Sequence, residues 1–155
     1  MSQIELGNKI PDFTGQATSD INFKLKDYAG TAILFYFYPR DNTPGCTQEG
    51  KDFRDNYAAF EAKGIKIFGL SRDSLKTHEN FKAKHEFPFD LISDKDETIC
   101  KLFDVIKEKK LYGKVHMGIE RSTFLIDSSG KLINEWRKVK VKDHIAQVLE
   151  AIEAL

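Results

Sequence analysis

The chain has 155 residues, of which 24 are basic and 24 acidic, so its formal net charge is zero at pH 7. This length predicts one domain over residues 1–155 with a single core, and the charge balance argues against nucleic acid or an anionic membrane as a partner. The longest apolar run, residues 32–38, is much too short for a membrane span of roughly 20 residues, and the N-terminus has no apolar signal core, so we expect a cytoplasmic protein.

The first two thirds of the chain alternate between strand-like and helix-like patterns. A minor hairpin is expected near Phe13 and residues 22–24, ahead of an apolar strand over residues 31–38. The pattern then predicts, in chain order, a helix from Thr43 to about Lys63, a strand over 65–70, a helix from Asp73 or Ser74 to about Lys84, a strand over 89–92 and a short helix over about 96–103.

The last third of the chain no longer alternates between strands and helices. Residues 107–117 are strongly charged and are expected to form a loop. Residues 121–126 and 131–136 read as two strands joined by a turn at 127–130, and an amphipathic helix ends the chain.

This order of elements predicts the fold class. The early β-α-β-α-β-α units favour parallel pairing, whereas the late hairpin favours antiparallel pairing. We therefore expect an α/β protein of thioredoxin-like architecture, with a central mixed sheet flanked by helices on both faces and an additional N-terminal β-hairpin.

The cysteines indicate where the chemistry lies. Two thiols, Cys46 and Cys100, are too few for a disulfide scaffold, and the four histidines are scattered without ligand spacing, so no metal site is expected. Cys46 lies between the apolar strand and the first turn of the following helix. The unpaired N–H groups and partial positive charge of a helix N-terminus favour the nucleophilic thiolate over the thiol.

The neighbours of Cys46 fit a reactive thiol. Thr43 is a good N-cap, Pro44 suits the first helical position, and the Thr43 hydroxyl is expected to accept a hydrogen bond from the Cys46 amide. Pro39 ends the strand and could shield the pocket from water. Glu49 lies one turn further on, either as an exposed helix residue or as a group that orients a nearby cation.

The string of residues 38–49, Tyr-Pro-Arg-Asp-Asn-Thr-Pro-Gly-Cys-Thr-Gln-Glu, resembles the peroxiredoxin motif Pro-x-x-x-Thr-x-x-Cys. The full string resembles the bacterioferritin comigratory protein branch, also called peroxiredoxin Q. The resemblance continues through residues 92–94, 118–127 and 136–141. It implies that Cys46 is the peroxidatic cysteine and that Arg121 is the active-site arginine, with Thr43 and Pro39 completing the site.

The resemblance also implies an activity. The chain is expected to be a thiol-dependent peroxidase that reduces hydrogen peroxide and organic hydroperoxides to water and alcohols, without a cofactor, in antioxidant defence and cell redox homeostasis. Cys46 would cycle through a sulfenic acid, which a thiol reductant such as thioredoxin or glutaredoxin with glutathione returns to the thiol. Relatives of this branch are often monomers, so a monomer is expected, with a homodimer as the alternative.

The chain departs from this family at the resolving cysteine. Many relatives carry one five residues after the peroxidatic cysteine, where Lys51 stands here, or in the stretch matching residues 80–84, which contains Lys82. Cys100 is the only other thiol, and it reads either as a packed helix residue or as a resolving cysteine. We therefore expect a one-cysteine cycle that uses an external thiol.

Other functions fit less well. A thiolate phosphatase needs Cys-x5-Arg, but its arginine position is Asp52, and a thioredoxin-type oxidoreductase needs Cys-x-x-Cys, but position 49 is Glu. A catalytically silent thioredoxin-fold binding module stays open as the alternative, although it leaves the set of Pro39, Thr43, Cys46 and Arg121 without a purpose.

Overall fold

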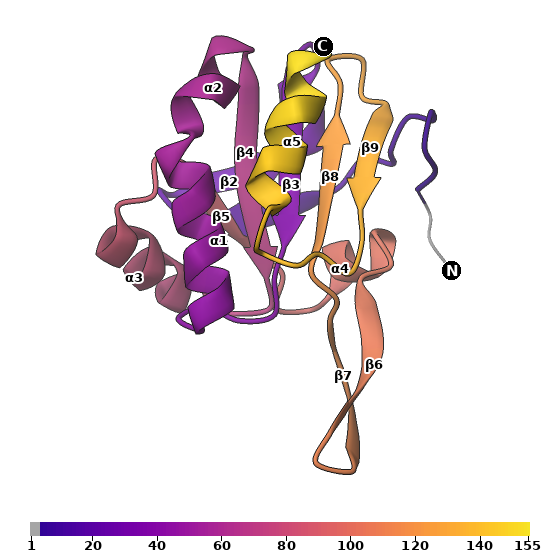
Figure 1. The fold of residues 1–155 in the computed structure, drawn as a ribbon. Coiled ribbons are helices and arrows are strands. Elements are labelled where there is room, and N and C mark those ends of the chain that lie inside the picture. Colours follow the sequence, from indigo (N-terminus) through magenta and orange to yellow (C-terminus); the bar gives the residue numbers. More distant parts are fainter. Residues whose placement is uncertain (1–3) are drawn as a thin grey trace.

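A central mixed sheet organises the protein, which is described here over residues 4–155 of a computed structural model (Figure 1). Its seven strands lie in the order β2-β1-β5-β4-β3-β8-β9, in which β3, β4 and β5 are parallel and the outer pairs are antiparallel. The strands are β1 (Thr14–Ala17), β2 (Ile21–Lys24), β3 (Ala32–Phe37), β4 (Ile65–Ser71), β5 (Asp90–Ser93), β8 (Ser122–Ile126) and β9 (Leu132–Trp136). The mixed sheet and the N-terminal hairpin β1–β2 agree with the sequence-based prediction.

The helices follow the predicted order with one interruption. They are η1 (Leu25–Tyr28, a 3₁₀ helix), α1 (Pro44–Asp55), α2 (Tyr57–Ala62), α3 (Leu75–His85), α4 (Thr98–Leu102) and α5 (His144–Glu153). The single helix expected after Cys46 is broken at Asn56, whose side-chain amide donates to the Asp52 carbonyl at 2.8 Å. Asparagine competes for backbone hydrogen bonds in this way, which explains the break. None of the helices in residues 4–155 is long and apolar enough to cross a membrane.

The sheet separates two apolar cores. Along β3, Ile33, Phe35 and Phe37 point into one core, and the alternate residues Leu34 and Tyr36 point into the other. Side chains from α1, α2, α3 and α5 fill the second core, whereas α4 and the N-terminal segment cover the first. Helices therefore lie on both faces of the sheet, as expected.

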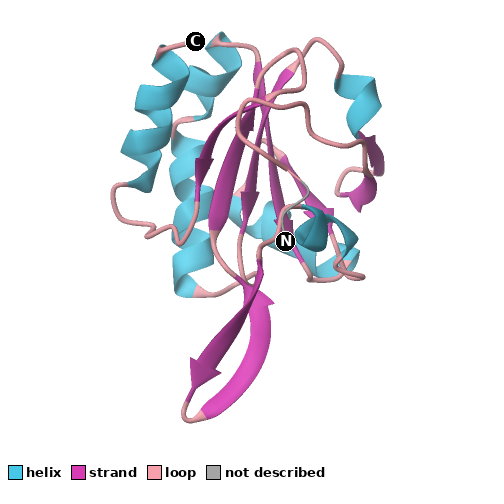
Figure 2. Ribbon diagram, turned by 90° about the vertical axis from the view of Figure 1, so that its right-hand side faces the viewer, coloured by secondary structure: helices cyan, strands magenta, loops and turns pink. Residues whose placement is uncertain are grey.

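The charged loop expected over residues 107–117 is wrong, because this segment forms a two-stranded hairpin. Its strands β6 (Ile106–Leu111) and β7 (Lys114–Ile119) pair antiparallel with each other and not with the central sheet. Figures 1 and 2 show the hairpin extending away from the body of the protein. Because most of its length buries neither face, the apolar alternation that normally marks a strand is missing from the sequence.

Gly50 in α1 is required by close packing. A methyl group at this position would overlap the ring of Phe87, which is buried against Phe81 and Phe89. We expect Gly50→Ala to lower the free energy of unfolding by about 1–2 kcal/mol, because overpacking outweighs the better helix propensity of alanine. Urea denaturation measures this effect. Lys51→Ala in the same helix is the control, and an equally stable or more stable Gly50→Ala protein would contradict the packing argument.

Candidate active site

Cys46 lies at the third position of α1 and is 1% exposed. Its Sγ accepts a hydrogen bond from Arg121 Nη2 at 3.4 Å. Arg121 reaches it because β3 and β8 are antiparallel neighbours, and the pairing of Phe37 with Ser122 sets the residue before β8 beside the end of β3. Cys46 and Arg121, 75 positions apart in the sequence, thus meet where β3 ends and β8 begins.

Glu49 is buried and pairs with Arg121. The carboxylate is 2% exposed, and its Oε1 accepts a hydrogen bond from Arg121 Nη1 at 2.7 Å. Of the two roles left open by the sequence, the geometry agrees with the one in which Glu49 orients the cation. One guanidinium therefore holds a carboxylate with one nitrogen and the thiol sulfur with another, an arrangement suited to the rigid fork of arginine.

Burial raises the pKa of Glu49 to about 7 from an ordinary value of 4.5, against the opposing effect of Arg121. Its second oxygen, Oε2, has no hydrogen-bond partner among the described residues. Between pH 4.5 and pH 7 the folded protein keeps a proton on Glu49 that the unfolded chain has lost. The free energy of unfolding therefore falls as the pH rises through this range.

Glu49→Gln removes this titration. We expect the stability of the variant relative to the original protein to rise between pH 5 and pH 7.5, by up to about 3 kcal/mol. Urea denaturation at the two pH values measures the difference. Glu61→Gln, on the exposed side of α2, is the matched control, and an unchanged stability difference across this range would contradict the assignment.

Thr43 and Pro39 precede the thiol by three and seven residues, but one expected contact is missing. Thr43 occupies the N-cap position with an extended backbone, yet its hydroxyl makes no cap hydrogen bond and instead donates to the Arg40 carbonyl at 3.1 Å. The expectation that it accepts from the Cys46 amide is therefore wrong. The hydroxyl is turned toward the preceding loop, so it does not occupy the Cys46 amide. Pro39 is half-buried, two residues after the end of β3.

A buried polar network that was not predicted from the sequence anchors the same loop. Asp41 accepts a hydrogen bond from the Tyr38 hydroxyl at 2.6 Å, and its other oxygen lies 2.6 Å from His78 Nδ1. His78 Nε2 lies 3.1 Å from the Ile92 carbonyl, and the Asp41 amide donates to Asp73 at 2.9 Å. The only sequence signal for this network was a histidine on the apolar side of α3.

Asp41, Asp73 and His78 also form the one group of potential metal ligands found among the described residues, with ligand atoms within 4.8 Å of one another. Both nitrogens of His78 are already occupied by Asp41 and the Ile92 carbonyl. The arrangement is thus complete as a hydrogen-bonded network that fixes the loop before α1.

Cys100 is separated from Cys46 by the central sheet. It is fully buried in the core on the opposite face of the sheet from Cys46. Burial and the nearby Asp94 carboxylate strongly raise the pKa of its thiol. Such a thiol is poorly suited to nucleophilic attack, because the thiolate is the reactive form.

Comparison with known proteins gives a consistent set of relatives. The profile of the AhpC/TSA family matches residues 6–134. Peroxiredoxin Bcp of Bacillus subtilis is 51% identical, over 97% of this chain and 96% of its own length. Peroxiredoxin Bcp of Xanthomonas campestris is 54% identical over 84% of this chain and 81% of its own length.

Solved structures agree with these relatives. A Cys-to-Ser mutant of PrxQ from Xylella fastidiosa superposes with a TM-score of 0.93 at 40% identity, covering 99% of this chain and 98% of the other. The bacterioferritin comigratory protein of Xanthomonas campestris, studied for its alkyl peroxide reduction activity, gives a TM-score of 0.90 at 46% identity, covering 97% of this chain and 98% of the other. The thioredoxin-like architecture is thereby confirmed.

Proposed function

The chain belongs to the AhpC/TSA family of peroxiredoxins and is a thiol-dependent peroxidase, and from this premise we propose that Cys46 is its peroxidatic cysteine. The observation that carries the proposal is the hydrogen bond from Arg121 Nη2 to the buried Cys46 sulfur at 3.4 Å. The cation and the N-terminus of α1 both place positive charge beside this sulfur. Thr43 and Pro39 complete the site.

The proposed reaction uses these groups directly. The Cys46 thiolate attacks the terminal oxygen of a hydroperoxide, the S–O bond forms as the O–O bond breaks, and the departing alkoxide or hydroxide takes up a proton. Cysteine is oxidised by two electrons to sulfenic acid, and the peroxide is reduced to an alcohol or water. Arg121 and the Cys46 amide stabilise the negative charge that develops on the two oxygens. Hydrogen peroxide and organic hydroperoxides are the proposed substrates.

We propose that oxidised Cys46 is reset by an external thiol. Cys100 is separated from Cys46 by the sheet, and neither position at which relatives carry a resolving cysteine holds a thiol. Lys82, within the stretch of residues 80–84, forms an ion pair with Asp90 at 2.6 Å. A thioredoxin, or a glutaredoxin with glutathione, in the cytoplasm would provide the reducing thiol for this antioxidant cycle.

Mass spectrometry after one equivalent of hydrogen peroxide tests both parts of the proposal. We expect Cys46 to gain one oxygen, or to form a mixed disulfide when a small thiol is present, while Cys100 stays reduced. A Cys46–Cys100 disulfide as the main product would overturn the one-cysteine cycle. An oxidation product confined to Cys100 would overturn the assignment of Cys46.

A further inference from the structure

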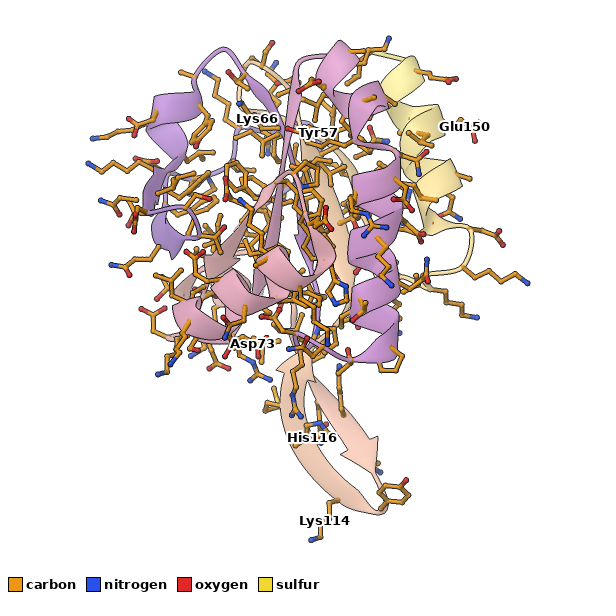
Figure 3. The ribbon with its side chains drawn as sticks, turned by 90° about the vertical axis from the view of Figure 1, so that its left-hand side faces the viewer. Tyr57, Lys66, Asp73, Lys114, His116 and Glu150 are labelled. Atoms are coloured by element: carbon orange, nitrogen blue, oxygen red, sulfur yellow. The ribbon has the colours of Figure 1, made fainter. Side chains whose placement is uncertain are left out.

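The hairpin of β6 and β7 forms an arm that begins at the active site. Strand β7 ends at Ile119, two residues before Arg121, and the Glu120 amide donates to the Val105 carbonyl at 2.7 Å to close the base of the arm. Each strand has six residues, so the arm extends about 20 Å from this base. Figure 3 shows Lys114 and His116 on the arm, well below the body that carries Asp73.

The outer part of the arm exposes large apolar side chains. Of the five large hydrophobic residues that are exposed in the described chain, three lie here: Tyr112 at 95%, Met117 at 54% and Val115 at 51%. Apolar and aromatic groups of this kind are typical anchors of protein interfaces. An arm with no function would be expected to carry polar residues at these places.

The turn at the tip strengthens this point. Tyr112 has φ +53° and Gly113 has φ +75°, the left-handed conformation that asparagine followed by glycine adopts most readily in a two-residue hairpin turn. A bulky aromatic residue is unfavourable at positive φ. The chain thus keeps a strained and almost fully exposed tyrosine at the point of the arm furthest from the active site, which is typical of a residue retained for binding.

The arm is also basic. It carries Lys107, Lys109, Lys110 and Lys114 against a single carboxylate, Glu108. Lys107 pairs with Asp104 at its base, whereas the other three lysines have no ion-pair partner among residues 4–155. Partial burial and the positive charges of Arg121 and Arg72 lower the pKa of Lys109, so this lysine lies within electrostatic reach of the active-site arginine.

We propose that this arm is the docking surface for a protein reductant, a dithiol protein with an acidic surface around its reactive cysteine. This inference rests on the proposed one-cysteine cycle. One partner thiol would condense with the Cys46 sulfenic acid, forming a mixed disulfide and releasing water. The second partner thiol would then attack the partner's own sulfur in that disulfide, which releases the Cys46 thiolate and oxidises the partner by two electrons.

The size and charge of the arm favour this occupant over others. A small thiol could not contact Cys46 and a tip about 20 Å away at once, but a protein could. A second copy of the chain pairing arm to arm about a two-fold axis would bring like charges together. An acidic protein gains both charge complementarity and the exposed aromatic anchor.

Steady-state peroxidase assays with two reductants test the inference. One reductant is an acidic thioredoxin recycled by its reductase and NADPH, and the other is dithiothreitol, which needs no docking surface. Tyr112→Asn removes the anchor while providing a preferred turn residue, so we expect unchanged or higher thermal stability. We expect KM for thioredoxin to rise about fivefold to tenfold in this variant, with the dithiothreitol-supported rate within about twofold.

Reversal of charges on the arm is the second test. Lys110→Glu with Lys114→Glu should raise KM for thioredoxin about tenfold and weaken its salt dependence. Lys26→Glu with Lys66→Glu, on the body of the protein, makes the same change in net charge and should leave KM within about twofold. Equal KM values in the two double variants would overturn the inference.

Other outcomes also decide the matter. Absence of turnover with thioredoxin, while dithiothreitol supports it, would overturn the inference, as would a dimer in sedimentation experiments that Tyr112→Asn dissociates. The protein could instead bind a duplex oligonucleotide, and Lys110→Glu with Lys114→Glu could abolish that binding. This result would assign the arm to nucleic acid and overturn the inference. If peroxide alone fails to oxidise Cys46, the proposed function itself is wrong; normal oxidation with an arm-independent KM overturns only the docking surface.

Discussion

Replacing Cys46 by serine is expected to lower the rate of peroxide consumption by on the order of 10⁴-fold or more, to the uncatalysed background. The thiolate is the nucleophile in this reaction, and a serine hydroxyl is far weaker as a nucleophile and cannot form a sulfenic acid. Cys100→Ala should keep the rate within about twofold of the original protein, since its side chain lies in the other core. The assay follows peroxide loss with dithiothreitol as reductant.

The pair of cysteine variants also separates the two function classes left open by the sequence. Equal, background-level rates in the original protein and in Cys46→Ser would leave only a binding module. A loss of turnover in a folded Cys100→Ala protein, checked by circular dichroism, would assign Cys100 a part in the cycle despite its burial. The combination we expect, loss at Cys46 and retention at Cys100, fits only a one-cysteine peroxidase.

Much of the fold could be predicted because its signals are local. The apolar run before Cys46 and the capping residues Thr43 and Ser74 mark strand and helix boundaries within a few residues, and the Ser74 hydroxyl does accept from Thr77 N at 3.2 Å. The position of Cys46 at a helix N-terminus follows from the same local rules. Arg121 was predicted only through the family resemblance. The strand register that brings it to the thiol depends on pairing with a distant strand and cannot be read from the residues around Arg121.

The features that could not be predicted depend on contacts between distant residues. From the sequence, Glu49 fits an exposed helix position as well as a position in the site. Its ion pair with Arg121 in the structure decides between the two. The pairing of Asp41 with His78 joins residues 37 positions apart, and the sequence around either residue does not indicate the other as its partner. The arm was missed for the opposite reason: exposed on both faces, it has no burial pattern from which a strand can be recognised.

Replacing Arg121 by methionine is expected to have the second-largest effect, a fall of about 10²–10³-fold in the second-order rate constant for peroxide. The variant keeps the approximate size of the side chain but loses the cation 3.4 Å from the Cys46 sulfur, and with it the positive charge that stabilises the developing charge on the peroxide oxygens. Stopped-flow oxidation under single-turnover conditions measures the rate, without any contribution from the reductant step.

Arg121→Met also leaves the Glu49 carboxylate buried without its partner, so stability must be separated from catalysis. Because Arg121 lowers the pKa of Glu49, its removal favours the protonated carboxyl at pH 7, so the cost in stability should lie below the value of about 3–5 kcal/mol for an unpaired buried charge. Adding Glu49→Gln should therefore restore most of the stability while the peroxide rate stays low. Recovery of the rate together with the stability would mean that Arg121 acts only through folding, and would remove it from the site.

Arg121→Lys refines the argument, because it keeps the charge but not the shape. An ammonium group cannot hold Glu49 Oε1 and the Cys46 sulfur with two fixed nitrogens, as the guanidinium does at 2.7 and 3.4 Å. We expect an intermediate fall of about tenfold, with stability closer to that of the original protein. If lysine and methionine reduce the rate equally, the planar fork is what the reaction requires; if lysine is fully active, the charge alone is sufficient.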